Sequence, residues 1–119
     1  MNAKLTGQSM KIPPTAFTSV DWTKLPRERH VGETGYADWR VLMIGDIRVR
    51  LVEYSADYLA DHWCERGHIL LVLSGEMDTE LRDGRRVRLS AGVSYHVSDD
   101  GDVAHRSSSK DGATLFIVD

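Results

Sequence analysis

The chain has 119 residues, of which 41% are hydrophobic and 28% are charged, and its formal net charge is -3 at pH 7. This length and composition predict one globular domain that buries a core without disulfides, and the single cysteine excludes an internal one. The negative net charge argues against a nucleic-acid partner, because nucleic acids bind basic protein surfaces. No apolar run approaches the ~20 residues of a membrane-spanning helix, and no signal-peptide h-region stands at the start. We therefore expect a cytoplasmic protein with no membrane partner.

The first 30 residues differ in composition and periodicity from the rest of the chain. They contain all three prolines and show little regular periodicity. A Pro-Pro pair resists both a helix and a central strand. We predict an extended N-terminal arm over residues 1–30, with residues 1–9 a candidate for disorder, and a folded domain over residues 31–119. Three apolar side chains are expected to fix the arm to the domain or to a second subunit: Phe17, Val20 and Trp22.

From Trp39 onward the apolar residues alternate at period two, which is typical of half-buried strands. In IRVRLVEYS, Ile47, Val49 and Leu51 share one face. MDTELRDGRRVRL reads as two strands that turn at Asp83-Gly84. Further strands are expected within residues 68–75, 92–98 and 112–119. Many short strands between Gly and Asp turns predict an all-β sandwich or jelly-roll barrel.

The stretch DHWCERGH, residues 61–68, holds two of the five histidines and the only cysteine. If residues 62–64 are a strand, His62 and Cys64 project from the same face. His68 begins the next apolar strand, and Gly67 can supply the turn before it. One thiolate and two imidazoles form a partial ligand set for zinc, nickel or iron. The competing interpretation is a buried cysteine and satisfied histidines that only pack.

Among the other histidines, His105 is the best fourth ligand. It follows a polar turn and starts a segment that can form another strand at the same rim. His96 alternates out of phase with Tyr95 and Val97, so it faces away from the core if those two face inward. His30 lies in the arm and is expected to be solvated.

The spacing of these residues resembles the first metal motif of the cupin superfamily (RmlC-like), which has the form G-x5-H-x-H-x3,4-E-x6-G. His62 and Cys64 match the H-x-H pair, with cysteine in place of the second histidine. His68 stands at the glutamate position, and Gly75 follows after six residues. The second motif is matched loosely at three positions: Gly92, Gly101 and His105.

Within cupins, the chain is similar to a small bacterial group with a DHCW motif and no assigned reaction. The similarity lies in the run ETG…W…VEYSA…LADHWC…GH, which extends from Glu33 to His68. This resemblance implies a single-domain double-stranded β-helix, a metal at the wide end of the barrel, and a homodimer.

Glu53 shares parity with Ile47, Val49 and Leu51, which places its carboxylate on the predicted core face. An unpaired charge there would be costly. Glu53 is therefore a candidate hydrogen-bond acceptor for a ligating imidazole, an extra ligand or a general base.

Two functions stay open from the sequence. A divalent transition metal (zinc, nickel or iron) held by His62, Cys64, His68 and His105 could serve a metalloenzyme that acts on a small molecule in the barrel. Four protein ligands are instead typical of closed structural sites. They favour a non-catalytic module that senses a small molecule, a metal or an oxidant. The sequence does not decide whether the protein is an enzyme.

Overall fold

The structure is a computed structural model that describes residues 12–99 and 104–119. The candidate disordered segment 1–9 and Gly101 of the second motif lie outside these residues. The described elements, in chain order, are η2 (Trp22–Lys24), β1 (Glu28–Val31), β2 (Tyr36–Ile44), β3 (Ile47–Tyr54), β4 (Tyr58–Leu59), β5 (His68–Leu81), β6 (Arg86–Ser90), β7 (Ser94–Val97), β8 (His105–Ser109) and β9 (Ala113–Val118). No helix in these ranges is long and apolar enough to cross a membrane.

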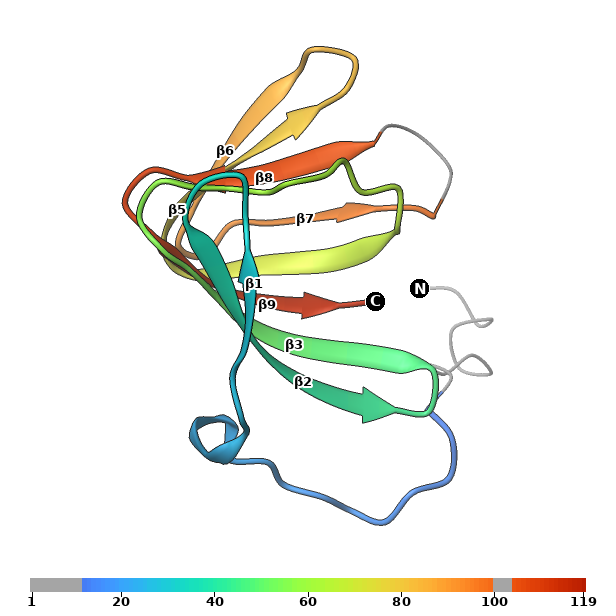
Figure 1. Ribbon diagram of the computed structural model, residues 1–119. Coiled ribbons are helices and arrows are strands. Elements are labelled where there is room, and N and C mark those ends of the chain that lie inside the picture. The colour runs from blue at the N-terminus through green and yellow to red at the C-terminus, as the bar shows by residue number, and fades with distance from the viewer. Residues whose placement is uncertain (1–11, 100–103) are drawn as a thin grey trace.

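The strands form one curled antiparallel sheet in the order β1-β2-β3-β9-β5-β8-β4, and β6 and β7 also pair with β5. The 14-residue strand β5 joins the two halves of the sheet, because its first part pairs with β9 and β7 and its second part with β6 and β8. The sheet curls until β6 and β8 lie across from β2 and β3 (Figure 1). This arrangement confirms the predicted jelly-roll barrel, with residues 68–75 as the first half of a longer strand.

Gly75 lies where β5 passes from one half of the sheet to the other. Its φ is 76°, and a β-carbon there would come within 2.9 Å of the Ala113 Cα. A register shift between Val72 and Ser74 precedes it. Glycine is required at this bend because other residues rarely adopt this φ and would collide with β9.

The core is a cluster of nine buried apolar side chains that alternate along β2, β3, β5, β6 and β9. Burial of each large member contributes about 1.5–3 kcal/mol relative to exposure. Four aromatic side chains pack against this cluster: Trp39, Tyr54, Tyr58 and Tyr95. The cluster forms the core of the barrel.

The strand register arranges the barrel-facing side chains of β3, β9 and β5 in rows. The innermost row is apolar, and the outer rows carry charge. From the core outward, the rows are Val52–Leu115–Val72, then Arg50–Ile117–Leu70, then Arg48–Asp119–His68. We call the outermost row, together with Tyr95 and His105, the barrel mouth.

The N-terminal arm lies on the outer face of the sheet. Trp22 of η2 meets Phe116 of β9 edge to face, with ring centroids 5.9 Å apart. The last residues of the arm form β1, which pairs with β2 at the sheet edge. Phe17 contacts little within the chain, since it is 99% exposed. Of the expected anchors, Trp22 therefore fixes the arm to the domain.

The prediction that Glu53 faces the barrel core is wrong. Val52 and Tyr54 face the core, so Glu53 between them points to the outer face. Its carboxylate lies 3.5 Å from Arg40 and 3.8 Å from Arg27, and its side chain is 43% exposed. The arm contacts this outer face, so apolar residues of β3 are covered on both faces of the sheet. The alternation of Ile47, Val49 and Leu51 therefore identified the outer face as the barrel interior.

Candidate functional site

Three rings meet at the barrel mouth. His68 Nε2 lies 2.7 Å from the Tyr95 hydroxyl. The ring of His105 stands edge-on to that of His68, with centroids 4.8 Å apart. His105 is only 3% exposed, and it begins β8 as predicted. The fold therefore brings together two of the four predicted ligands, with a phenol beside them.

His68 is partly buried, and its two ring nitrogens differ in environment. Nε2 is bound to Tyr95, whereas the buried Nδ1 has no hydrogen-bond partner among the described residues. Burial, followed by the nearby His105 and Arg50, lowers the pKa of His68 to about 4. The imidazole is therefore neutral at pH 7, the form that can bind a metal.

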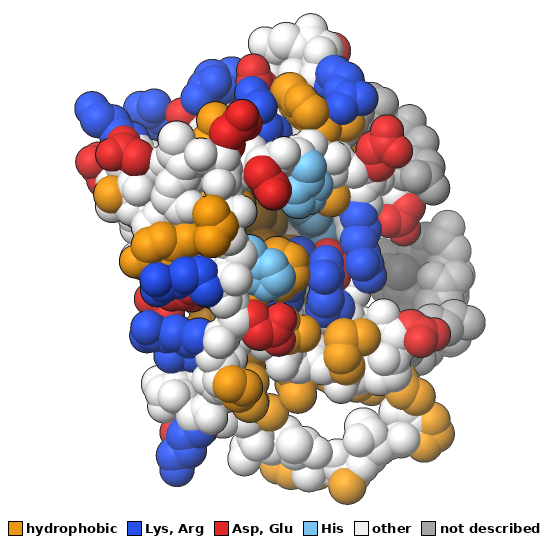
Figure 2. All heavy atoms as spheres, viewed as in Figure 1, with side chains coloured by type: hydrophobic (Ala, Val, Ile, Leu, Met, Phe, Trp, Pro, Cys, Tyr) orange, Lys and Arg blue, Asp and Glu red, His pale blue; other side chains and the backbone are white. Residues whose placement is uncertain are grey.

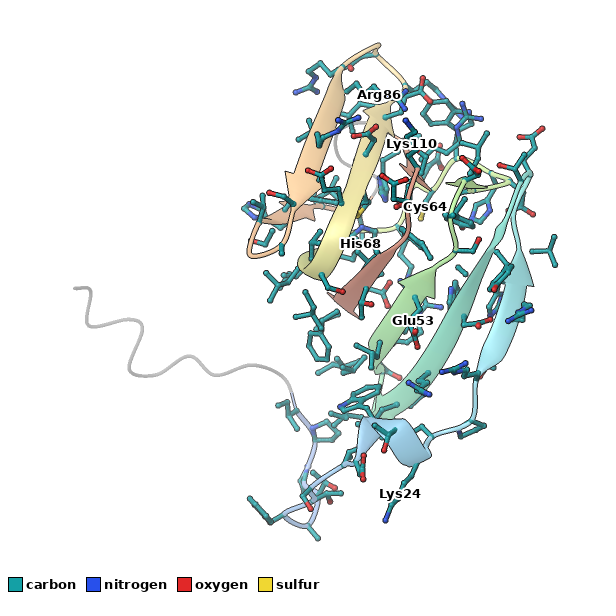
Figure 3. The ribbon with its side chains drawn as sticks, turned by 90° about the vertical axis from the view of Figure 1, so that its left-hand side faces the viewer. Lys24, Glu53, Cys64, His68, Arg86 and Lys110 are labelled. Carbon is teal, nitrogen blue, oxygen red and sulfur yellow. The ribbon has the colours of Figure 1, made fainter. Side chains whose placement is uncertain are left out.

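Cys64 faces His105 across a short bridge between their backbones. The two residues exchange both hydrogen bonds, at 2.8 Å and 2.9 Å. In such an antiparallel pair the two side chains project from the same face of the sheet. The Cys64 Sγ also lies 3.4 Å from the Arg66 backbone nitrogen, which donates to it. Figure 3 shows Cys64 and His68 on neighbouring segments of the chain.

His62 is turned away from this group. Its Nδ1 lies 2.7 Å from the Asp61 carboxylate, and its side chain is 71% exposed. The condition that residues 62–64 form a strand is not met, because only Cys64 makes a bridge in this segment, so strand parity does not place His62 beside Cys64. Within residues 12–99 and 104–119, no three His, Cys, Asp or Glu side chains gather closely enough to hold a metal ion as arranged.

Contacts of Trp63 and Gly67 fix the segment that carries Cys64. The guanidinium groups of Arg82 and Arg106 lie over the Trp63 ring, at 5.1 Å and 4.7 Å from its centroid. The Gly67 nitrogen donates to the Asp99 carboxylate at 2.6 Å. A β-carbon at Gly67 would meet backbone atoms of residues 97–99 at 2.5–2.7 Å, so glycine permits this close approach. These contacts hold the segment against the rim of the barrel.

The other histidines lie outside the mouth. His96 on β7 is exposed, while its neighbour Tyr95 packs inward, as the alternation predicted. His30 stacks on Trp39 with a centroid distance of 3.8 Å and stays largely exposed. Neither residue points toward His68.

A group of charged residues at the mouth was missed by sequence reasoning. The Asp119 carboxylate, 1% exposed, receives two hydrogen bonds of 2.9 Å from Arg48 and one of 3.0 Å from Arg50. Burial opposes ionisation, but these bonds and the charges of Arg50, Arg48 and Arg66 keep the pKa of Asp119 low. The only sequence signal was the alternation in β3, which places Arg48 and Arg50 on the face opposite Ile47, Val49 and Leu51.

A cavity of about 190 Å³ adjoins the ring cluster. Tyr95 and His105 form part of its wall, and half of the remaining lining residues are aliphatic. Its described lining residues are Thr79, Leu81, Arg85, Val87, Tyr95, His96, Val97 and His105. The cavity can hold a small organic molecule next to the imidazole of His105.

Comparisons with known proteins agree with this architecture. No protein-family model matches the chain, and no curated protein matches its sequence. Among solved structures, an RmlC-like cupin from Shewanella frigidimarina matches with a TM-score of 0.67 and 19% identity, over 87% of this chain and 89% of that chain. The protein has the cupin fold. A cupin-superfamily sugar phosphate isomerase from Silicibacter pomeroyi matches with a TM-score of 0.70 and 15% identity, over 85% and 74% of the two chains.

Ectoine synthase from P. lautus is also similar to this chain, with a TM-score of 0.69 and 13% identity over 86% and 76% of the two chains. At these identities the likeness establishes the fold and transfers no activity. The predicted cupin architecture is confirmed. The similarity to the DHCW group stays a prediction.

Proposed function

We propose that this cupin binds a divalent transition metal at the barrel mouth through His68, His105 and Cys64, and uses it on a small molecule. The observation that carries the proposal is the buried Nδ1 of His68, which has no hydrogen-bond partner in the part of the chain that the structure describes. A buried nitrogen without a partner is costly, so its presence calls for a ligand.

The hydrogen bond to Tyr95 suits this role. When His68 Nε2 carries the proton and donates to the Tyr95 oxygen, Nδ1 carries a free lone pair. Ligating histidines commonly donate their other ring N–H to an oxygen, which fixes the tautomer and the ring orientation. Tyr95 is thus the orienting residue for His68. Burial raises its pKa, so the phenol stays neutral.

The donor types favour a borderline metal. Two imidazoles and a thiolate suit zinc, nickel or iron, whereas calcium and magnesium prefer oxygen ligands. Such an ion would act on the small molecule as a Lewis acid or, if it is iron, as an oxygen-activating centre.

The orientation of His62 bears on whether the site is catalytic. Three protein ligands leave a position for water or substrate, as in catalytic zinc sites, whereas four close the site. His62 is bound to Asp61 at the surface, which supports a three-ligand site with an open position. If His62 joins as the fourth ligand, the alternative of a non-catalytic sensing module is favoured.

Metal titration of four variants tests this proposal. H68Q, H105Q and C64S are each expected to weaken metal affinity at least about tenfold, because each removes a donor. H62Q is expected to keep the wild-type affinity. H30Q, at an exposed histidine on β1 that does not line the cavity, is the matched control. Unchanged affinity in H68Q would contradict the proposal, and a large loss in H62Q would establish the four-ligand alternative.

The homodimer implied by the cupin resemblance belongs to the same proposal. The fully exposed Phe17 and the exposed Val31 on the edge strand β1 support a second copy at this side of the barrel. Sedimentation analysis is expected to give a dimer that F17A weakens. A wild-type monomer at micromolar concentration would contradict it.

A cytoplasmic location is likewise proposed, and fractionation of the host cell tests it.

A further inference from the structure

Three arginines converge on one side-chain carboxylate at the barrel mouth. Arg48 and Arg50 lie 2.9–3.0 Å and Arg66 lies 3.8 Å from the carboxylate of Asp119. Among the described residues, these arginines form ion pairs with Asp119 alone. One side-chain carboxylate therefore serves three guanidinium groups.

The imbalance is most severe at Arg50. Its side chain is only 8% exposed, and its Nε has no hydrogen-bond partner among the described residues. Burial and the adjacent charge of Arg48 lower its pKa. The ring of Trp39, 4.4 Å from the guanidinium carbon, offers partial compensation. Arg50 is paired with Asp119, but a buried N–H donor without a partner is costly, so its Nε calls for a further acceptor.

We propose that the barrel mouth binds a small carboxylate at Arg50 and Arg66, beside Asp119. A carboxylate is then the class of small molecule that reaches the proposed metal site, and to that extent the inference rests on the proposed function. The anion site itself involves no metal ligand.

Asp119 identifies the chemistry that fits. Arg48 donates two hydrogen bonds to this carboxylate, the bidentate geometry in which a planar guanidinium matches a planar carboxylate. Arg50 donates one hydrogen bond to it, and its Nε has no partner within residues 12–99 and 104–119. Arg66 contacts it only at 3.8 Å. A second carboxylate would take these spare donors and bring the site close to neutrality.

The cluster can be reached from solvent. Arg66 is 51% exposed and Arg48 is 22% exposed, so the charged row borders the opening while Arg50 lies beneath it. Figure 2 shows histidine side chains at the centre of this face next to a group of Lys and Arg side chains. His68 belongs to the same row as Arg48 and Asp119, so an anion bound there lies beside the imidazole cluster.

The test uses metal-free protein from which the chelator has been removed, because a polycarboxylate chelator would itself compete. Succinate and its neutral analogue succinamide are titrated at constant ionic strength while thermal unfolding is followed. Succinate is expected to raise the Tm in a saturable way, and succinamide is not. Equal effects of the two compounds, or no effect of succinate, would overturn the proposal. Because no metal is present, failure here leaves the metal proposal untouched.

Substitutions locate the site. R50Q and R66Q are expected to weaken succinate binding at least about tenfold and threefold, respectively, through loss of charge-assisted hydrogen bonds. R66Q keeps the test decisive if R50Q does not fold, because Arg66 is half exposed. R86Q is the matched control, since Arg86 pairs with Asp78 on the β5–β6 hairpin. D119N should bind succinate more tightly, because it removes the internal competitor. Wild-type affinity in R66Q, or an equal loss in R86Q, would overturn the assignment.

Discussion

His68 and Tyr95, on the neighbouring strands β5 and β7, are joined by a 2.7 Å hydrogen bond between Nε2 and the phenol oxygen. The register pairs Tyr95 with Leu70 and His68 with Val97, so the phenol and the imidazole lie diagonally on the barrel-facing side. The bond fixes the ring of His68 and leaves Nδ1 as its free nitrogen. The proposed metal site depends on this orientation.

Y95F tests that dependence. Removing the hydroxyl leaves His68 Nε2 without its partner, so neither the tautomer nor the orientation of the imidazole is fixed. The aromatic ring still packs against the core. Metal affinity is expected to fall about 10–100-fold, the usual effect of losing an outer hydrogen bond to a ligating histidine. Competition with a chromophoric chelator measures it. Y36F serves as the control, since Tyr36 lies on β2 under Arg29. Equal affinities of Y95F and wild type would show that Tyr95 does not orient the ligand.

Stability of the metal-free protein should fall as the pH decreases from 7 toward 4. The folded protein holds the pKa of His68 at about 4, below the ordinary value of 6.5, so the unfolded chain takes up the proton first. The contribution of neutral His68 to the free energy of unfolding is fully present above pH 6.5 and is lost progressively as the pH falls to about 4. Urea unfolding at pH 7.5 and 4.5 should differ by roughly 2–3 kcal/mol through this residue.

H68Q removes the titrating group, so its stability should depend less on pH over this interval. H96Q, altered at an exposed position on β7, should keep the wild-type slope. If H68Q retains the full slope, His68 does not cause the dependence.

Glu53 offers a test of the outer-face assignment. It forms long ion pairs with Arg40 and Arg27 at a largely exposed position, so E53Q should change the free energy of unfolding by no more than about 1 kcal/mol. Metal content should stay the same. A large loss of metal in E53Q would place the carboxylate near the ligands after all, contrary to its position on β3 (Figure 3).

The arm should be held by Trp22. W22A removes the edge-to-face contact with Phe116 and should destabilise the protein by about 1–3 kcal/mol. Limited proteolysis is expected to cut residues 12–27 faster in this variant. K24A is the matched control, because Lys24 lies on the same short helix with an exposed side chain. Equal cleavage rates in W22A and K24A would mean that other contacts hold the arm.

Local signals in the sequence predicted much of the barrel. The Asp83-Gly84 turn, the inward Tyr95, the outward His96 and the start of β8 at His105 all follow from period-two alternation and turn chemistry. Each depends on neighbours within a few residues. The sequence pattern therefore sufficed for strands and hairpins, and the cupin motif spacing for the fold.

Features that depend on distant segments were not predictable in the same way. Arg48 and Asp119 are 71 residues apart, and only the pairing of β3 with β9 brings them together. The two faces of β3 cannot be told apart by alternation, because the arm contacts one and the core the other. His62 was assigned by strand parity in a segment that makes only one bridge, at Cys64.

Elemental analysis of the protein, purified without chelator, decides whether the barrel mouth holds a metal. We expect close to one equivalent of zinc, nickel or iron per chain in the wild type and a strongly reduced content in H68Q. A wild-type protein with normal thermal stability and no stoichiometric metal would contradict it.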